Sequence, residues 1–372
     1  MPRIDERIPV IRRLAERGVD EDRRRGRAAV TNPSGRYEPI ARVDEDDGWG
    51  SSEELPEFKT HVTVETPRSI ITQNESPDIP FDQSINPYRG CEHGCIYCFA
   101  RPTHAFMGLS PGLDFESRLF AKENAATLLE RELSAKTYKP KLIAIGTNTD
   151  PYQPIERDRK IMRQVLEVLS RFNHPVGIVT KSALVTRDID VLAPMAAKGL
   201  AKVYLSVTTR DGTLARRMEP RASTPRKRLD AVKQLNAAGI PTGVMVAPII
   251  PSLNDHEIEK ILEEAKAVKA TEANYIFLRL PLELKDLFRE WLQDHYPGRL
   301  NHVLGLVKDA HGGVDYRPRF GERMRGEGVY AALIAQRFKV ACERFGLNQE
   351  RHRVRTDLFK VPPKAGDQMS LF

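Results

Sequence analysis

Short apolar segments alternate with longer amphipathic segments through the middle of the chain. The apolar segments are five to eight residues long and rich in β-branched side chains, which is typical of strands buried on both faces. Five of them lie at 141–146, 176–180, 203–207, 242–249 and 275–280. The amphipathic segments predict helices at 158–171, 187–198, 226–238 and 255–268, and Asn254 is the N-cap candidate of the last one.

A further strand is predicted at 84–89, which gives about six strand–helix units. Alternation of strand and helix predicts parallel strands joined by right-handed crossovers. The predicted fold class is therefore α/β. Reactive residues are expected at the carboxyl ends of the strands, where such folds build their active sites.

The sequence predicts four regions along the chain. Residues 1–60 are charged and contain few apolar side chains, so they are predicted to be a disordered arm. Residues 61–297 contain the alternating pattern, and 298–360 form a basic helical extension with a helix expected at 329–344. Residues 361–372 carry Pro and Gly and are predicted to be a flexible tail.

The composition predicts a large domain in a reducing compartment. The 372 residues are 40% hydrophobic, and three of the four Cys are clustered, unlike the spread of a disulfide framework. No apolar stretch approaches the ~20 residues of a membrane span, and the N-terminus lacks the apolar core of a secretory signal. These features predict a cytoplasmic protein without a membrane segment. The net charge of +7 is compatible with a nucleic-acid partner but does not identify one.

Three thiols lie close together in the motif Cys91-x3-Cys95-x2-Cys98. Gly90 and Gly94 let this loop turn tightly, so that the sulfurs can converge on one point. Thiolates are soft ligands that favour iron–sulfur clusters and zinc. Three of them are one short of a closed structural zinc site, and a [4Fe–4S] cluster held by three Cys keeps one iron open.

A zinc knuckle is the alternative interpretation of these thiols. It requires a fourth ligand, for which His93 and Cys342 are the candidates. Zinc sites usually pair two short spacings, and the ordered strand–helix pattern after the motif is not typical of a knuckle.

The cysteine motif, with aromatic Tyr97 before its last Cys, resembles the signature of radical S-adenosylmethionine (SAM) enzymes. The segments 86–91 and 146–156 look most like the branch related to spore photoproduct lyase, and the resemblance spans roughly 81–282. It implies a partial, open TIM-type (β/α)6 barrel with a [4Fe–4S] cluster and SAM as cofactors. In this family the open iron binds SAM. One electron from an external donor then cleaves SAM to methionine and a 5′-deoxyadenosyl radical.

The resemblance also implies where SAM is held. Tyr97 would contact the adenine, and Lys181 would meet the carboxylate of SAM. An interior Lys at a strand end is costly unless it has an anionic partner, which favours this role for Lys181. For Tyr97 the alternative is ordinary core packing.

Polar residues at two further strand ends complete the candidate SAM contacts. Asn and Asp oxygens can accept the N–H groups of the methionine moiety, and hydroxyls can hold the ribose. These candidates are Thr147, Asn148, Asp150, Ser206 and Thr208. The alternatives are a polar turn after the strand at 141–146 and plain core packing after the strand at 203–207.

The chain departs from the lyase pattern at one point. Spore photoproduct lyase places a Cys near the end of its second strand as a hydrogen-atom donor, whereas this chain has Ile145, Gly146 and Thr147 there. This departure puts in doubt the repair of the thymine lesion on which spore photoproduct lyase acts. The residue that donates the hydrogen atom is unassigned. Arg279, at the end of the strand at 275–280, would point its guanidinium toward the site if the alternation of that strand directs it inward. Glu156 and Arg221 are possible substrate contacts without a place in the site, and Tyr152 or Tyr204 is a possible hydrogen-atom relay.

Segment 316–325 interleaves Arg with aromatic residues. Such a segment either stacks bases and contacts phosphates, or it closes the open barrel with its Arg paired to local acids. The Arg run 23–27 similarly either contacts phosphates or is a solvated part of the arm.

The last five residues resemble the bacterial sliding-clamp-binding pentapeptide. Gln368 would make an orienting hydrogen bond, while Leu371 and Phe372 would fill an apolar pocket of the clamp. A chance apolar terminus is the alternative, because short motifs have many false positives.

Three functions follow from these patterns. The first is a radical SAM enzyme that repairs or modifies DNA, with possible recruitment by the sliding clamp. The second is a radical SAM enzyme with an RNA or protein substrate. The third is a non-catalytic metal-cluster protein that binds nucleic acid.

Overall fold

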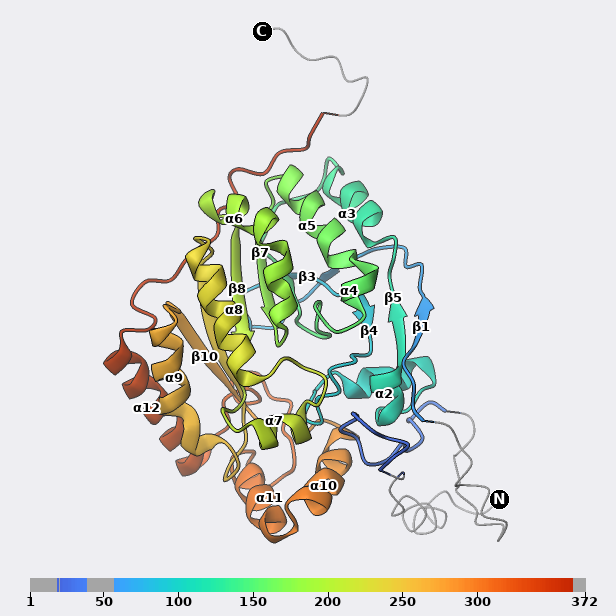
Figure 1. Cartoon of the computed structure of the whole chain (residues 1–372), viewed down its shortest axis with the longest axis vertical. Coiled ribbons are helices and arrows are strands. Elements are labelled where there is room, and N and C mark those ends of the chain that lie inside the picture. The colour runs from blue at the N-terminus through green and yellow to red at the C-terminus, as the bar shows by residue number, and fades with distance from the viewer. Residues whose placement is uncertain (1–18, 20, 39–56, 364–372) are drawn as a thin grey trace, which may run out of the picture.

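The computed structural model describes residues 19, 21–38 and 57–363 (Figure 1). Its centre is a seven-stranded sheet in the order β10-β9-β8-β7-β6-β3-β2. Neighbouring strands from β3 to β10 are parallel, and β2 pairs antiparallel with β3. The strands are β2 (Ile71–Gln73), β3 (Gln83–Ile85), β6 (Ile143–Ile145), β7 (Val176–Thr180), β8 (Ala201–Ser206), β9 (Thr242–Ile249) and β10 (Glu272–Phe277).

Amphipathic helices connect the parallel strands and bury their apolar faces against them. The principal helices are α3 (Ala125–Leu133), α5 (Ile161–Arg171), α6 (Ile189–Ala197), α8 (Pro225–Ala237) and α9 (Ile258–Ala267). In α5 the predicted stripe of Ile161, Val165 and Leu169 is fully buried. The α/β class and the alternating order are therefore confirmed, with element ends shifted by a few residues. The predicted strand at 84–89 is the exception, because it is interrupted after Ile85 and its last two residues pair in a different sheet. The shorter helices are η3 (Arg101–Met107), α4 (Glu156–Arg159), η4 (Ala183–Asp188), α7 (Gly212–Met218), η5 (Asp255–Glu257) and η6 (Pro297–Arg299), where η marks a 3-10 helix.

Asn254 does not cap α9 as predicted, because η5 separates it from the helix and its side chain makes no capping hydrogen bond. Its amide instead donates to the carbonyl oxygens of Thr208 at 2.7 Å and Pro248 at 3.0 Å. Its carbonyl oxygen accepts from the backbone N–H of Ile250 at 2.6 Å. The side chain therefore ties together the carboxyl ends of β8 and β9.

A second, three-stranded sheet lies beside the first, in the order β1-β5-β4. It consists of β1 (His61–Val64), β4 (Tyr88–Arg89) and β5 (Arg118–Ala121), and α2 (Leu113–Ser117) leads directly into β5. The sequence did not predict this sheet. Its strands are two to four residues long, which is too short for apolar periodicity to register.

Residues 21–38 pack against the folded domain, so the prediction of a disordered arm is wrong for them. Arg24, Arg27 and Thr31 are buried. The Arg24 guanidinium donates to the Asp294 carboxylate at 3.1 Å, and the Thr31 hydroxyl donates to Glu290 at 2.5 Å. The high charge of this segment misled the prediction, because its guanidinium groups bind protein oxygens rather than water. Apart from Val19, the rest of 1–56 lies outside the described residues.

Three helices follow the sheet: α10 (Leu284–His295), α11 (Leu300–Asp309) and α12 (Gly328–Phe345). The predicted helix at 329–344 is confirmed as α12, which lies against α9 (Figure 1). Phe338 of α12 packs on Tyr275 of β10, with ring centroids 4.8 Å apart. No helix among the described residues is both long and apolar enough to cross a membrane.

Segment 316–325 lies along β10. The backbone N–H of Phe277 donates to the carbonyl oxygen of Met324 at 2.8 Å. Arg323 pairs with Asp78 and Arg317 pairs with Glu327. These contacts support the interpretation that the segment covers the β10 end of the sheet with its Arg paired to local acids.

Candidate functional site

The three thiols lie in one loop between β4 and η3, and none of the four Cys forms a disulfide. Gly90 and Gly94 have φ angles of +71° and +65°. A Cβ at Gly94 would stand 2.6 Å from a carboxylate oxygen of Glu116. The loop therefore needs glycine at this position both for its backbone conformation and for the close approach of Glu116.

Cys91 and Cys95 are buried, and Cys98 is partly exposed. Burial, with the charges of Asp150 and the neighbouring thiols, raises the pKa of Cys91 well above its ordinary value. Burial likewise raises the pKa of Cys95 to about 12. The thiols of Cys91 and Cys95 would therefore stay protonated at neutral pH, unless a metal that binds thiolate replaces their protons.

The candidates for a fourth zinc ligand are His93 and Cys342. His93 Nδ1 faces the Asp150 carboxylate at 3.3 Å. Cys342 is buried in α12, where its sulfur accepts from the Asn348 amide at 3.7 Å. Within the described residues, no three His, Cys, Asp or Glu side chains are grouped to hold a metal ion. These placements disfavour the zinc knuckle.

Arg101 is the fully buried side chain that holds the cysteine loop in place. Its guanidinium donates to the carbonyl oxygens of Gly94 and Cys95, each at 2.9 Å. On its other side it donates to the carbonyl of Gly112 at 2.9 Å and to the Glu116 carboxylate at 2.5 Å. One cation thereby satisfies carbonyl groups that the turn of the loop leaves without backbone partners.

Glu116 connects the cysteine loop to the N-terminal segment. Besides Arg101, its carboxylate accepts the backbone N–H groups of Ala28 at 3.0 Å and Ala29 at 2.9 Å. Arg27 donates to the backbone carbonyl of Glu116 at 2.5 Å. The N-terminal segment and the cysteine loop, which are far apart in sequence, are therefore held together through the buried carboxylate of Glu116.

Glu92, which lies between Cys91 and Cys95, also connects the cysteine loop to other parts of the chain. Its backbone N–H donates to the Gln153 side chain at 2.7 Å, and its carboxylate pairs with Arg221 at 3.0 Å. The Thr60 hydroxyl also donates to this carboxylate. Arg221 therefore helps to hold the cysteine loop.

Asp150 lies beside the thiols at the carboxyl end of β6, as the sequence predicted. Its carboxylate accepts from the Thr180 hydroxyl at 2.7 Å and from the backbone N–H of Lys181 at 2.8 Å. Burial would raise the pKa of Asp150, but His93 and these hydrogen bonds outweigh burial and lower the pKa well below its ordinary value. Asp150 is therefore an ionised carboxylate whose oxygens are largely occupied by protein donors.

Lys181 follows β7, and its ammonium lies 5.7 Å from the centre of the Tyr97 ring. Burial acts to lower its pKa, but Cys95, Glu219 and Asp150 outweigh burial and raise the pKa above its ordinary value. No carboxylate among the described residues lies within ion-pair distance of the ammonium. A charged, half-buried amine without a direct partner is suited to an anionic ligand.

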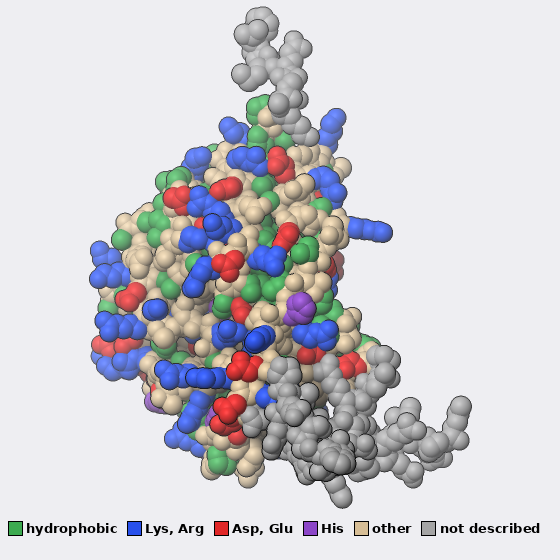
Figure 2. All heavy atoms as spheres, turned by 45° about the vertical axis from the view of Figure 1, so that its right-hand side comes forward, with side chains coloured by type: hydrophobic (Ala, Val, Ile, Leu, Met, Phe, Trp, Pro, Cys, Tyr) green, Lys and Arg blue, Asp and Glu red, His purple; other side chains and the backbone are tan. Residues whose placement is uncertain are grey.

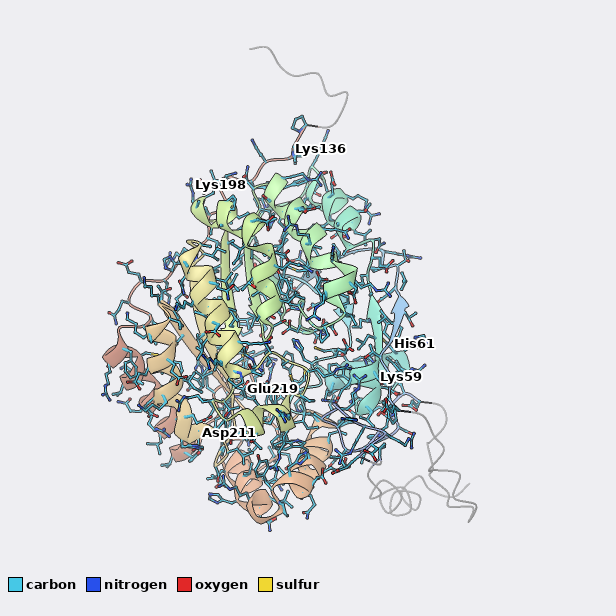
Figure 3. The ribbon with its side chains drawn as sticks, viewed as in Figure 1. Lys59, His61, Lys136, Lys198, Asp211 and Glu219 are labelled. Atoms are coloured by element: carbon cyan, nitrogen blue, oxygen red, sulfur yellow. The ribbon has the colours of Figure 1, made fainter. Side chains whose placement is uncertain are left out.

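The Tyr97 hydroxyl donates to the Glu219 carboxylate and lies 3.2 Å from the Thr208 hydroxyl. Glu219 also pairs with Arg228, whose guanidinium donates to the carbonyl oxygen of Ser206 at 2.9 Å. Figure 3 labels Glu219 at the end of α7. The sequence analysis missed Glu219 and Arg228, because neither belongs to a motif and a single buried acid in a turn leaves no periodic signal.

The remaining predicted SAM contacts are Thr147, Asn148, Ser206 and Thr208. Thr147 and Asn148 are partly exposed in the loop after β6. The backbone N–H of Asn148 donates to the Asn86 side chain at 3.2 Å, while no hydrogen bond of the Asn148 amide is found among the described residues. Ser206 is buried at the end of β8. The Thr208 hydroxyl is already bound to the Ala247 carbonyl oxygen at 3.2 Å.

Glu156 has a structural role in this loop. It is fully buried and accepts from the Tyr88 hydroxyl at 2.5 Å, from Arg187 at 2.7 Å and from the backbone N–H of Met162 at 3.1 Å. Its carboxylate therefore fixes the start of α5, and its protein partners leave little capacity for substrate.

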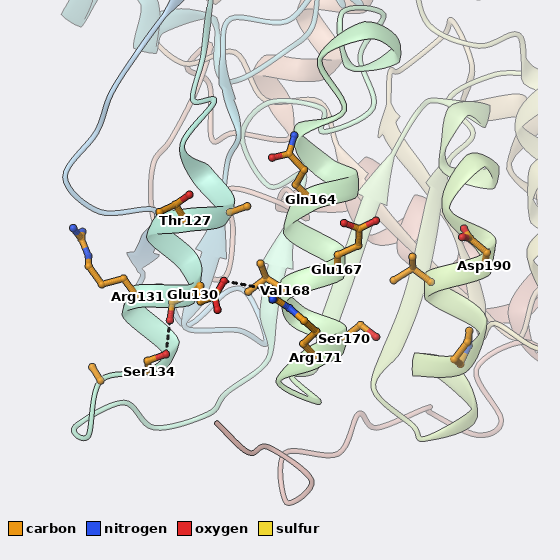
Figure 4. Close-up of a pocket in the computed structure, with 14 residues that line it drawn as sticks. Thr127, Glu130, Arg131, Ser134, Gln164, Glu167, Val168, Ser170, Arg171 and Asp190 are labelled. Carbon is orange, nitrogen blue, oxygen red and sulfur yellow. Dashed lines mark hydrogen bonds and ion pairs between the residues drawn. The ribbon is translucent and has the colours of Figure 1, made fainter. Parts of the chain in front are cut away.

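A groove of about 1050 Å³ lies between α3, α5 and α6 (Figure 4). Glu130 and Arg171 form an ion pair across it at 2.7 Å. It contains none of the predicted site residues. On the face drawn in Figure 2, Lys and Arg are scattered among Asp and Glu, so charge alone does not mark a binding surface there.

Comparison with known proteins identifies the family. The Radical SAM superfamily matches residues 85–265, which include the three thiols and the strands up to β9. The uncharacterized protein Rv2578c of Mycobacterium tuberculosis is 36% identical over 260 residues, covering 69% of this chain and 75% of that protein. The uncharacterized protein MJ0683 of Methanocaldococcus jannaschii is 31% identical over 214 residues, covering 57% and 76%.

The chain belongs to the radical SAM superfamily. It is therefore a radical SAM enzyme, which sets aside the non-catalytic alternative. Its fold is similar to that of a spore photoproduct lyase mutant, with a TM-score of 0.57, 16% identity, and coverage of 84% of this chain and 87% of that one. The lyase complexed with dinucleoside spore photoproduct gives 0.56 at 17% identity, covering 77% and 80%.

This radical SAM family implies a [4Fe–4S] cluster and SAM, and the residues present fit both. Three reduced thiols on one loop, namely Cys91, Cys95 and Cys98, would hold the cluster. The ammonium of Lys181, which has no ion-pair partner among the described residues, would offer an anion site near Tyr97. When bound, these cofactors supply the 5′-deoxyadenosyl radical, while the protein holds and orients them.

We predict that Cys91→Ala abolishes retention of iron, while the protein stays folded. The backbone N–H of Cys91 donates to the Phe115 carbonyl at 3.0 Å, a contact that the substitution leaves intact. Iron analysis and far-UV circular dichroism of anaerobically reconstituted protein measure the two effects. The control is Cys342→Ala, which should retain its iron. Collapse of Cys91→Ala on expression would instead indicate a structural metal.

We also predict that Arg101→Met lowers the free energy of unfolding by about 3–5 kcal/mol, because it leaves the buried Glu116 carboxylate without its cation. The matched control is Arg159→Met, which breaks the partly exposed pair with Glu123 and should cost less than about 1 kcal/mol. Urea denaturation measures both variants. Equal losses for the two would show that Arg101 is not the support of the loop.

Proposed function

We propose that this radical SAM enzyme acts on DNA, as a repair or base-modifying enzyme. The observation that carries the proposal is the cysteine loop with the free Lys181 ammonium beside it, on a lyase-like fold. A relative of that fold is known in complex with a dinucleoside lesion, and the net charge of +7 suits a polyanionic substrate. In this proposal the parallel strands form the open (β/α)6 barrel whose carboxyl end faces the substrate.

We assign the SAM contacts on the same basis. Lys181 holds the carboxylate, because its ammonium has no ion-pair partner among the described residues. Asn148 is better suited to the amino group than Asp150, because the Asp150 oxygens are occupied. Tyr97 offers its ring to the adenine while Glu219 fixes its hydroxyl.

The other proposed SAM contacts are Thr147, Ser206 and Thr208. Thr147 adds a hydroxyl beside Asn148 in the loop after β6. Ser206 lies within reach of the ribose at the end of β8, whereas the Thr208 hydroxyl is already occupied by protein groups. We therefore place Ser206 ahead of Thr208 for the ribose.

The expected activity is reductive cleavage of SAM that DNA accelerates. Reconstituted protein would be incubated with SAM and dithionite under anaerobic conditions, and 5′-deoxyadenosine would be quantified with no nucleic acid, with DNA or with RNA. Lys181→Ala should raise the SAM concentration needed for half-maximal cleavage by roughly tenfold or more, since a charged hydrogen bond is worth about 1.5–3 kcal/mol. Lys198→Ala, a surface Lys on α6, is the control.

An RNA or protein substrate is the second candidate. Acceleration of cleavage by RNA but not by DNA would replace the first proposal. Absence of 5′-deoxyadenosine from fully reconstituted protein under every condition would contradict both.

We further propose that the tail recruits the enzyme to the sliding clamp through Gln368, Leu371 and Phe372, which lie outside the described residues. Its support is the sequence pattern alone. A synthetic peptide of residues 361–372 should bind a bacterial sliding clamp with micromolar affinity, measured by calorimetry. A peptide with Leu371→Ala and Phe372→Ala is the control, and no binding at ~100 μM of the native peptide would remove the proposal.

A further inference from the structure

Every exposed aromatic ring among the described residues has an arginine against it. The four rings are Tyr37, Phe99, Phe106 and Phe320, whose exposed fractions are 58%, 38%, 69% and 55%. We call these four rings the aromatic face.

The arginines of the aromatic face lie close to the rings. The Arg36 guanidinium is 5.5 Å from the centre of the Tyr37 ring and 5.9 Å from that of Phe106, and these two rings stack 5.4 Å apart. Arg279 lies 3.9 Å from the centre of Phe99.

The same pairing continues at 316–325. Arg323 lies 4.7 Å from the centre of the Phe320 ring. Alternating guanidinium and aromatic planes are the surfaces on which unpaired bases stack.

The aromatic face adjoins the cysteine loop. Phe99 follows Cys98 directly, and Phe106 lies on the short helix η3 that begins two residues after Phe99. Arg279 and Glu283 lie in the loop after β10, and Glu283 holds Arg36 through both carboxylate oxygens at 2.6 and 2.7 Å. The segments 36–37, 99–106 and 279–283 are far apart in sequence. The Tyr37–Phe106, Arg36–Glu283 and Arg279–Phe99 contacts bring them together.

Arg279, which lies against the Phe99 ring of the aromatic face, is available for a ligand. Its Nε is buried and has no hydrogen-bond partner, and no carboxylate among the described residues pairs with its guanidinium. The side chains beside it are Tyr316, Arg323 and Cys98. A guanidinium that stacks on an aromatic ring and has no carboxylate partner among the described residues is suited to a phosphate.

We propose that the aromatic face is a binding surface for single-stranded DNA next to the reacting base. Unpaired bases stack on Tyr37, Phe106 and Phe99, while Arg279 contacts a backbone phosphate. This inference rests on the proposed DNA substrate and narrows it, because a duplex keeps its bases stacked on one another and offers none to the rings. The enzyme therefore acts on an unpaired or extruded nucleotide.

The test measures binding by fluorescence anisotropy with the full-length reconstituted protein. The probes are a labelled single-stranded DNA of about 15 nucleotides, the same sequence as a duplex, and the matching RNA. Wild-type protein should bind the single strand at least roughly tenfold more tightly than the duplex, as expected if bases stack on the rings. The Tyr37→Ala/Phe106→Ala variant should lose roughly tenfold of single-strand affinity while duplex binding stays unchanged.

Two further variants separate stacking from folding. Tyr37→Leu/Phe106→Leu keeps apolar bulk without aromatic planes and should lose affinity as the alanine variant does. Val329→Ala/Leu333→Ala removes exposed apolar residues of α12 and should bind like the wild type.

The outcome is distinguishable from failure of the proposed function. SAM cleavage in the absence of DNA should be the same in all these variants, because Tyr37 and Phe106 lie outside the proposed SAM contacts. Equal affinity for duplex and single strand, or full affinity of the leucine variant, overturns the inference while a DNA substrate still stands. Tighter binding of RNA than of DNA overturns both the inference and the DNA substrate.

Discussion

The buried ion pair between Arg101 and Glu116 is the contact on which the site depends. A loop that turns sharply enough to bring three thiols together cannot satisfy its own carbonyl groups. Arg101 donates to two of these carbonyls, and Glu116 supplies the charge that makes a fully buried guanidinium tolerable. Gly94 has no side chain because Glu116 occupies the space that a Cβ would fill. The motif and its support are therefore one structural unit.

The same carboxylate explains why the N-terminal segment is folded. Ala28 and Ala29 donate their backbone N–H groups to the Glu116 carboxylate, and Arg27 donates to the backbone carbonyl oxygen of Glu116. A segment that is rich in charge and poor in apolar residues would gain little from hydrophobic burial. It is held by hydrogen bonds to charged groups, each worth more than a neutral one. Removal of this segment would take two backbone donors away from the Glu116 carboxylate that supports the cysteine loop.

The sequence predicted the parts of the fold that are periodic. The strand–helix alternation, the buried stripe of α5 and the helix α12 all followed from spacing, and the cysteine motif indicated the site. Arg101, Glu116, Glu219 and Arg228 could not be predicted, since each is a single charged residue whose partner is distant in sequence. Their burial comes from tertiary packing, and no local pattern marks a charge as internal. The prediction failed for 21–38 for the same reason, because charge composition does not reveal whether a guanidinium binds water or protein.

The structure also shows where the candidate hydrogen-atom donors Tyr152, Tyr204 and Cys342 lie. The Tyr152 hydroxyl is buried and donates to Asp188 at 3.0 Å, and the Tyr204 hydroxyl donates to Glu272, which is also held by the backbone of His352. Among the described residues, Cys342 is the one thiol outside the cysteine loop, and it lies within the core contacts of α12. A reaction that ends with hydrogen transfer from a protein thiol to the substrate, as in spore photoproduct lyase, therefore has no described donor at the site.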